Sequence, residues 1–204
     1  MVVTTSEGTR ERLISAAMHL FAEHGYAGTT IGQIESEAGL APRSGALYQY
    51  FESKRDLLDA AVARHAESLD QMQGITDLMP LGDLRAELTL MARWNLQDLR
   101  RRHDLYRFIR REGDRFPELL ATVYEKIGRE PLQRSADYLR QRFREGGVEE
   151  PDAEALVIVL VQTMSTYVSH IDVYGAPPLD VDEERFVTAW VDVCMAYARE
   201  RGLA

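Results

Sequence analysis

The sequence predicts an all-α fold, and two observations carry this prediction. Apolar residues recur every three or four positions in almost every segment, as Leu13, Ala17 and Leu20 do near the start of the chain, and this spacing places them on one side of a helix. Glycines, prolines and capping residues also divide the chain into pieces of helix length. The segment 156–161 is rich in β-branched residues, but helical spacing continues beyond it through Met164, so we expect a helix there too.

The N-terminal part predicts four helices, separated by glycines and started by hydroxyl side chains that can cap a helix. The expected elements are a first helix that ends at Gly25, a second from Thr30 to Gly39, a short third over 44–51 and a longer fourth capped by Ser53. Tyr26 directly follows Gly25, and we expect its ring to pack back against the first helix.

The rest of the chain predicts longer helices after a connection over 74–83, which contains two glycines and a proline. The expected helices cover 82–102, 104–113, 117–145 with a break at Pro131, 152–174 started by Asp152, and 183–201. We expect the break because proline lacks the N–H that a helix interior needs.

Composition and charge limit the possible classes. The chain has 204 residues, 45% of them apolar, so it can bury a real core. Its net charge of −9 argues against a protein that binds nucleic acid through bulk positive charge. Cys194 is the single cysteine, which rules out an internal disulfide and indicates a core thiol. The N-terminus has no apolar signal region, and the run 155–161 is far shorter than a membrane span, so we expect a cytoplasmic protein.

Residues 30–51 have the elements of a helix-turn-helix, namely a short capped helix, a glycine turn and a second short helix. Leu47 and Phe51 lie four positions apart and should face the core. The outward side of the second helix then carries small or polar residues that suit a major groove. These residues are Arg43, Ser44, Gly45, Ala46, Tyr48 and Gln49.

The first quarter of the chain resembles the TetR-type transcriptional regulators. The matching segments are Thr9-Arg-Glu-Arg-Leu-Ile-Ser-Ala-Ala17, Leu20-Phe-Ala-Glu-His-Gly-Tyr26, Thr29-Thr-Ile31, Ile34, Ala38-Gly39, and Leu47-Tyr-Gln-Tyr-Phe-Glu-Ser-Lys54 with Leu57-Leu58. The resemblance implies a three-helix DNA-binding domain over 1–52, a helical ligand-binding and dimerisation domain over 53–204, and a homodimer that binds double-stranded operator DNA.

The resemblance also implies roles for individual residues. Thr30, Tyr48 and Lys54 resemble the family's contacts to the DNA backbone, and Tyr50 would assist them. Base reading would fall to Arg43, Ser44, Ala46 and Gln49. The chain departs from the pattern in one place, because seven residues separate Gly39 from Leu47, two more than in many members. The start of the recognition helix therefore stays open at this point.

The last two expected helices carry broad apolar surfaces. Two such helices from each subunit would form a symmetric four-helix interface in a homodimer; the alternative is that these surfaces pack only within the monomer. A ligand cavity needs an apolar lining with a few polar groups, and eight residues have suitable types and positions. They are Met91, Trp94, Asn95, Tyr124, Thr163, Met164, Tyr167 and His170.

The main functional hypothesis is a ligand-responsive repressor, released from its operator by a small-molecule effector and associated with the nucleoid when bound to DNA. One alternative is a small-molecule sensor or protein-interaction adaptor without operator binding. An all-α enzyme is disfavoured, because the sequence lacks the usual catalytic, metal and cofactor motifs. Residues 39–55 carry three basic side chains against one acidic, although residues 1–60 carry five against eight. We therefore expect a small positive patch and a modest dependence of DNA affinity on salt.

Overall fold

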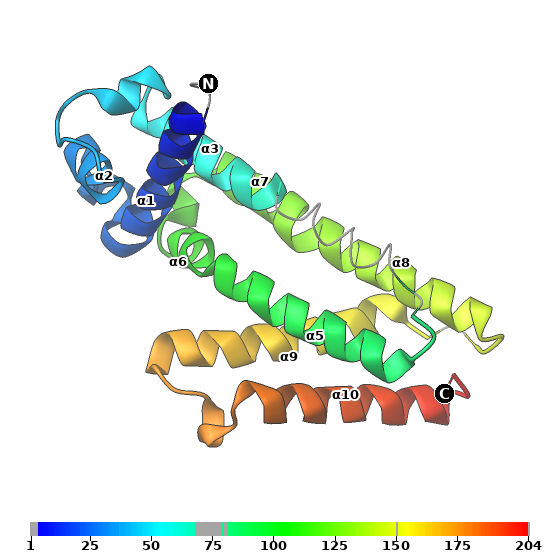
Figure 1. Cartoon of the computed structure of the whole chain (residues 1–204). Coiled ribbons are helices and arrows are strands. Elements are labelled where there is room, and N and C mark those ends of the chain that lie inside the picture. Colours follow the sequence, from blue (N-terminus) through cyan, green and yellow to red (C-terminus); the bar gives the residue numbers. More distant parts are fainter. Residues whose placement is uncertain (1–3, 68–78, 80, 150, 204) are drawn as a thin grey trace. The chain divides into compact units, whose positions relative to one another are not determined.

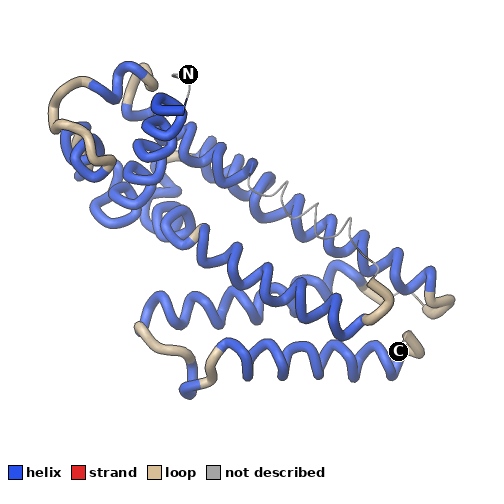
Figure 2. The backbone as a smooth tube through the Cα atoms, in the orientation of Figure 1, coloured by secondary structure: helices blue, strands red, loops and turns tan. Residues whose placement is uncertain are grey.

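The computed structural model describes residues 4–67, 79, 81–149 and 151–203. Every regular element within these residues is a helix or a helical turn, and they contain no strand (Figure 1, Figure 2). The all-α prediction is therefore confirmed. The chain forms two compact units, one made of residues 1–68 and 102–127 and the other of residues 69–101 and 128–204. The expected functional boundary between residues 52 and 53 stays a prediction.

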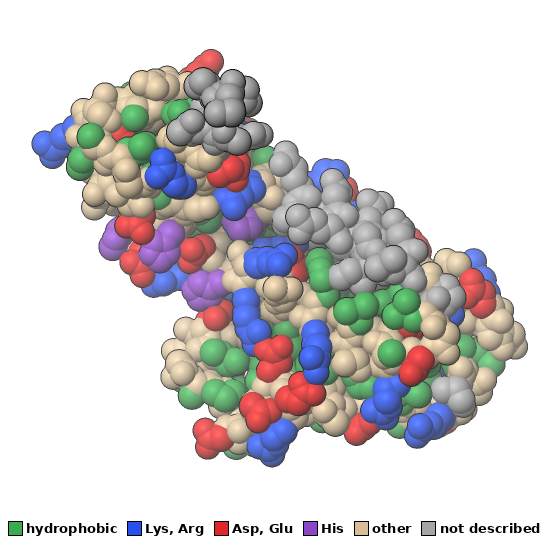
Figure 3. Space-filling view, viewed as in Figure 1, with side chains coloured by type: hydrophobic (Ala, Val, Ile, Leu, Met, Phe, Trp, Pro, Cys, Tyr) green, Lys and Arg blue, Asp and Glu red, His purple; other side chains and the backbone are tan. Residues whose placement is uncertain are grey.

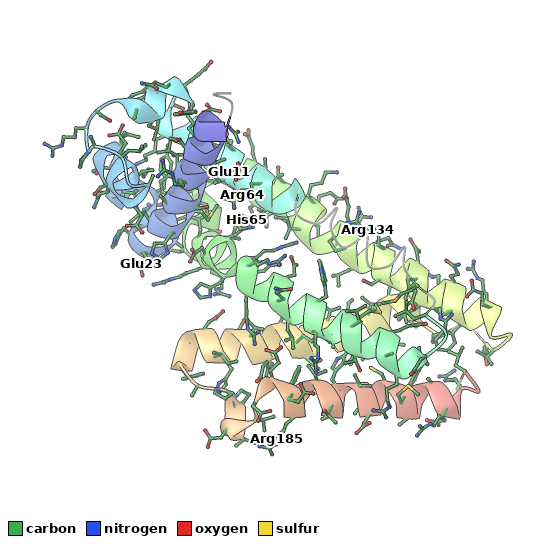
Figure 4. The ribbon with its side chains drawn as sticks, in the orientation of Figure 1. Glu11, Glu23, Arg64, His65, Arg134 and Arg185 are labelled. Atoms are coloured by element: carbon green, nitrogen blue, oxygen red, sulfur yellow. The ribbon has the colours of Figure 1, made fainter. Side chains whose placement is uncertain are left out.

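The first unit contains the helix-turn-helix and two later helices. Its elements are α1 (Thr4–Gly28), α2 (Ile31–Glu37), the 3-10 turn η1 (Ala46–Gln49), α3 (Lys54–Glu67), α6 (His103–Glu112), the 3-10 turn η2 (Gly113–Arg115) and α7 (Pro117–Val123). Arg64 of α3 ties this helix to the surface of α1, because it pairs with Glu11 at 3.2 Å and donates to Ser15 Oγ at 2.7 Å (Figure 4).

Four aromatic rings join the N-terminal helices to the later ones in this unit. Phe21 of α1 contacts Tyr26 and Phe108 with ring centroids 5.3 and 6.2 Å apart. Phe116 completes this aromatic cluster, because its ring centroid lies 5.1 Å from that of Tyr26 and 5.8 Å from that of Phe108. Tilted and edge-on ring pairs of this kind stabilise beyond their buried area. The core of the first unit is therefore complete only when α6 and the residue before α7 are in place.

Four longer helices form the described part of the second unit. They are α5 (Leu84–Arg101), α8 (Glu130–Glu145), α9 (Ala153–Tyr174) and α10 (Glu183–Glu200), with a 3-10 turn η4 (Pro178–Asp180) before the last. Leu96, Met164 and Val191 represent the three helices that share its main core. Cys194 is buried in this core, and burial raises the pKa of its thiol to about 12, as expected of a core residue rather than a nucleophile.

The expected helix starts at Ser53 and Asp152 are confirmed by their caps. The N–H of Asp56 donates to Ser53 Oγ at 3.0 Å, and the N–H of Ala155 donates to Asp152 Oδ1 at 3.0 Å. The β-branched segment 156–161 lies inside α9, so the helix prediction there is confirmed. Of the expected connection over 74–83, only residues 79 and 81–83 lie within the described residues.

Two expected helices differ from the observed ones. The third, expected over 44–51, is a single 3-10 turn over Ala46–Gln49. The helix expected over 117–145 breaks ahead of Pro131, because a π-helical segment η3 (Tyr124–Arg129) separates α7 from α8. Pro131 itself sits in the first turn of α8, where its missing N–H is not needed.

Gly25 interrupts α1 as expected, although the helix resumes for one more turn and ends at Gly28. The backbone of Gly25 has φ 76° and ψ 163°, a region that residues with a side chain avoid. A Cβ at this position would also lie 2.5 Å from Oε1 of the buried Glu112. The absence of a side chain thus lets α6 pack against the bend in α1.

Gly25→Ala should lower the free energy of unfolding by about 1–3 kcal/mol, because alanine would be strained at this backbone geometry. Gly28→Ala is the matched control, because a Cβ there meets nothing nearer than His24 Cβ at 3.8 Å. Urea unfolding followed by circular dichroism measures both. Equal stabilities for the two variants would contradict the constraint at Gly25.

Candidate functional site: the helix-turn-helix and a cavity in the second unit

Thr30 starts α2 through a complete capping box. Its Oγ1 accepts from the N–H of Gln33 at 3.3 Å, and Gln33 Oε1 accepts from the N–H and the hydroxyl of Thr30 at 2.8 and 2.7 Å. This arrangement satisfies donors that a helix start otherwise leaves open. Thr30 is exposed, but a phosphate could receive its hydroxyl proton only by displacing Gln33.

Glu35 connects α2 to the recognition turn from behind. Its side chain is fully buried beside Ile34, and Oε1 accepts from the N–H of Leu47 at 3.2 Å. The second oxygen, Oε2, is enclosed and has no hydrogen-bond partner. Because the N–H of Leu47 lies one residue into η1, this bond holds the start of the recognition turn against α2.

The segment between Gly39 and Leu47 is two residues longer than in many members of the family, and two of its residues have a left-handed backbone. Arg43 has φ 59° and Gly45 has φ 74°. A Cβ on Gly32 would lie 3.1 Å from Cγ of Arg43, so the stem of this arginine lies across α2. The recognition element in this structure is the single turn η1, which starts at Ala46 after these two left-handed residues.

η1 faces outward with polar residues, as the sequence predicts. Leu47 and Phe51 are buried, whereas Tyr48 is 60% exposed and Gln49 is also exposed. Of the other expected contact residues, Arg43 and Ser44 are exposed and Gly45, Ala46 and Tyr50 are half-buried. Ala46, Tyr48 and Gln49 thus lie in η1 itself, whereas Arg43, Ser44 and Gly45 precede it and Tyr50 follows it.

Lys54 has a structural role that the sequence did not predict. Its Nζ donates to the backbone oxygens of Tyr26 and Thr29 at 2.6 and 2.7 Å, and it lies 4.3 Å from the centre of the Tyr26 ring. Partial burial lowers the pKa of Lys54 below its usual value. Because an ammonium group has three donors, one N–H remains for a phosphate, and the expected DNA contact stays a prediction.

Glu35 is the residue that sequence reasoning missed. It lies on the same helix stripe as Ile31, Ile34 and Ala38, with the spacing that marks the buried side of α2. An acidic residue on such a stripe is costly unless it is hydrogen-bonded. The pattern therefore contained the signal, but it did not identify the partner, which lies twelve residues further on.

The second unit holds a cavity between α5, α8, α9 and α10. Met91, Trp94, Asn95 and Met164, four of the eight expected ligand residues, line it. Tyr138, whose hydroxyl donates to Glu87 Oε2 at 3.1 Å, also lines it. Burial and the neighbouring Glu87 raise the pKa of Tyr138 to about 12.

The other four expected ligand residues lie elsewhere. Tyr124 belongs to the first unit and is 65% exposed. Thr163 is exposed and donates to the oxygen of Leu160 at 2.8 Å. Tyr167 stacks on Phe186 at 4.2 Å and donates to the oxygen of Val181 at 2.9 Å. His170 Nδ1 lies 3.1 Å from the oxygen of Ala176.

Comparison with known proteins gives the first unit its identity. Residues 13–61 match the family described as bacterial regulatory proteins of the tetR family. This range runs from α1 into α3 and includes the whole helix-turn-helix. The chain is a TetR-family transcriptional regulator.

The relatives of this TetR-family regulator match its sequence over different lengths of the chain. An uncharacterized regulator of the helix-turn-helix type, YvkB of Bacillus subtilis (strain 168), is 23% identical over 88% of this chain and 91% of its own. HbdR of Aromatoleum sp. (strain CIB) is 42% identical, but only over 32% of this chain and 28% of its own. The higher identity is therefore confined to about a third of the chain.

Solved structures share the fold of the whole chain. A protein of Mesorhizobium loti MAFF303099 described as a TetR-family regulator matches with a TM-score of 0.71 at 23% identity, over 95% of this chain and 98% of its own. FadR of Bacillus subtilis, solved with stearoyl-CoA, matches with a TM-score of 0.65 at 19% identity, over 90% and 96%. The fold of this TetR-family regulator is thus shared at low identity.

Glu35→Leu should speed hydrogen exchange of the Leu47 amide by about tenfold, because it removes the acceptor of a buried N–H. Glu35→Gln keeps a carbonyl oxygen at the same place and should leave this exchange nearly unchanged. Amide exchange followed by NMR measures both variants. Slow exchange in the leucine variant would show that the bond does not hold the turn.

Proposed function

We propose that this TetR-family regulator is a homodimeric repressor that a small-molecule effector releases from its operator. The observation that carries the proposal is the recognition turn: Tyr48 is 60% exposed on a turn that the buried Leu47 and Phe51 fix from below. A large exposed aromatic side chain on a rigid turn of a DNA-binding fold is suited to contact nucleic acid rather than to stabilise the monomer.

The proposed contacts divide into positioning and reading. Tyr48, Lys54 and Thr30 would hold the DNA backbone, with Tyr50 at the edge of the same surface. Arg43 and Gln49 would reach base edges, since arginine pairs with guanine and glutamine with adenine in the major groove. In a homodimer, two such turns would enter successive major grooves about 34 Å apart along the operator.

Charge favours specific over non-specific binding in this proposal. The chain has a net charge of −9, and acidic and basic side chains are interspersed on the face shown in Figure 3. Two of the basic groups in 39–55 also have other partners, because Lys54 binds backbone oxygens and Arg55 pairs with Asp59 at 2.9 Å. Few phosphates would be neutralised, so affinity should fall only modestly with salt.

Selection of duplexes from a random library should yield an enriched pseudo-palindrome for the full chain. Tyr48→Ala should then weaken binding to the selected duplex by about tenfold or more, because it removes a proposed contact to the DNA backbone. Tyr124→Ala, a similarly exposed tyrosine outside the helix-turn-helix, should bind as the unchanged protein does. Fluorescence anisotropy with a labelled duplex measures these affinities.

Two results of this experiment would contradict the proposal. If no sequence is enriched, the chain is better explained as a sensor or adaptor without operator binding. If the Tyr48 variant keeps full affinity, the contact surface lies elsewhere on the molecule. A steep dependence of affinity on salt would likewise contradict the expectation of few phosphate contacts.

The homodimer is proposed on an exposed face of α9 and α10. Val159 is 61% exposed and Val193 is 64% exposed, and both line one groove beside Leu156. By length and composition alone, α9 is apolar enough to cross a membrane. One side of α9 packs into the core, and the other bears exposed apolar residues such as Ile158 and Val159. Met164 and Tyr167 of α9 do not contribute to this face, because both are buried in the core of this unit.

Val159→Arg combined with Val193→Arg should weaken self-association by at least about tenfold, because the interface would have to bury two unpaired charges. Sedimentation equilibrium measures the dimer dissociation constant. Leu81→Arg provides the control, since Leu81 is 51% exposed outside this face. A dimer that forms equally well in the double variant would place the interface on another surface.

Release by an effector follows from linkage in this proposal. If the effector and the operator favour different conformations of the dimer, each lowers the affinity for the other by the same factor. The solved relatives with the same fold include FadR bound to stearoyl-CoA and a regulator described as flavonoid-responsive, which supports a ligand-responsive regulator. We propose that the protein acts in the cytoplasm, on the nucleoid when bound to DNA, and has no catalytic activity.

A further inference from the structure

The cavity of the second unit limits the chemistry of the effector, provided that the proposed effector binds there. Its described lining is mostly apolar and contains no acidic or basic side chain. Both tryptophans of the chain, Trp94 and Trp190, are part of the wall. A ligand that fills this space loses contact with water and gains contact with aromatic and aliphatic groups.

Most polar groups of the wall already have partners. The hydroxyl of Tyr138 donates to Glu87, the ring N–H of Trp190 donates to the oxygen of Leu160 at 3.1 Å, and the hydroxyl of Ser135 donates to the oxygen of Pro131 at 2.9 Å. These donors are not available to a ligand without breaking bonds inside the unit.

Asn95 is the exception among these groups. It is the single asparagine of the chain and lies on the stripe of α5 formed by Leu88, Met91 and Leu99. Its Oδ1 is enclosed and has no hydrogen-bond partner, while the residue lines the cavity. A buried amide oxygen without a donor is unfavourable, so a ligand that supplies the donor gains affinity at this position.

Charge in the neighbourhood is already balanced. Glu87, fully buried behind Tyr138, accepts from the N–H groups of Leu81 and Gly82 at 2.6 and 3.2 Å. Arg142 lies 3.6 Å from Glu87 and 3.6 Å from Glu145. An anionic or cationic ligand group would therefore enter an apolar space beside Glu87 and Arg142, which are paired with each other, and burial of an unpaired charge is strongly unfavourable.

We propose that the effector is an uncharged, mainly apolar molecule with a hydroxyl group that pairs with Asn95. A hydroxyl can donate to Oδ1, the atom of Asn95 that has no donor. An aliphatic or aromatic alcohol has this chemistry, whereas a carboxylate or a phosphate-bearing thioester does not. The biological role of this ligand rests on the proposed effector response. Ligand binding itself can be measured without DNA.

The experiment uses four small probes and the fluorescence of the two tryptophans in the cavity wall. 1-Hexanol is compared with its isomer methyl pentyl ether, which cannot donate, and with hexanoate and hexylammonium, which carry charge. Hexanol should change the emission and bind about tenfold more tightly than the ether, because only hexanol donates to Asn95. Both ions should bind more weakly still.

Asn95→Leu should remove the preference for hexanol over the ether while keeping ether binding. Gln97→Leu, on the exposed side of the same helix, should keep the preference. Hexanoate or hexylammonium binding as tightly as hexanol, or a hexanol preference that survives in the Asn95 variant, would overturn the inference. Absence of any emission change with all four probes would also overturn it.

A separate measurement distinguishes this inference from the proposed function. If hexanol binds with the expected selectivity but leaves the affinity for the selected duplex unchanged, the ligand chemistry stands and effector release from DNA is wrong. If the chain selects no duplex at all, the fluorescence titration still decides the ligand chemistry.

Discussion

Glu35 accepts the backbone N–H of Leu47 inside the core of the first unit, and the geometry of the recognition turn depends on this bond. The segment before Leu47 is long and includes two left-handed residues, so its own backbone does not fix where the turn begins. A buried carboxylate needs donors, and here the N–H at the start of the turn supplies one. The turn that presents Tyr48 is thus held by the hydrogen-bonding needs of a single side chain.

The second unit uses the same principle at Glu87. This carboxylate is fully buried and holds the two backbone N–H groups that lead into α5, together with the hydroxyl of Tyr138. In doing so it engages the phenol of Tyr138, whereas Asn95 lines the same cavity with an Oδ1 that accepts no hydrogen bond. Buried acids therefore shape both functional regions, one by fixing a backbone segment and the other by deciding which polar group stays available.

Local signals explain what could be predicted from the sequence. Ser53 and Asp152 cap their helices as expected because capping depends on neighbours within three residues. The short third helix is a 3-10 turn, and the N–H of its second residue, Leu47, is bonded by Glu35 twelve residues earlier, a contact that local spacing does not reveal. Among the ligand residues, Met164 lines the cavity whereas Tyr167, one turn away on α9, stacks on Phe186. Helical spacing alone cannot separate two neighbouring buried surfaces of one helix.

The aromatic cluster of the first unit affects when this unit can fold during synthesis. Phe21 and Tyr26 find their partners in Phe108 and Phe116, and α5 of the other unit is translated between them. Since a domain generally folds as a unit during synthesis, the DNA-binding unit cannot complete its core when its own recognition turn leaves the ribosome. Until α6 and the segment that follows it have emerged, the nascent chain must keep these N-terminal aromatic side chains without their partners.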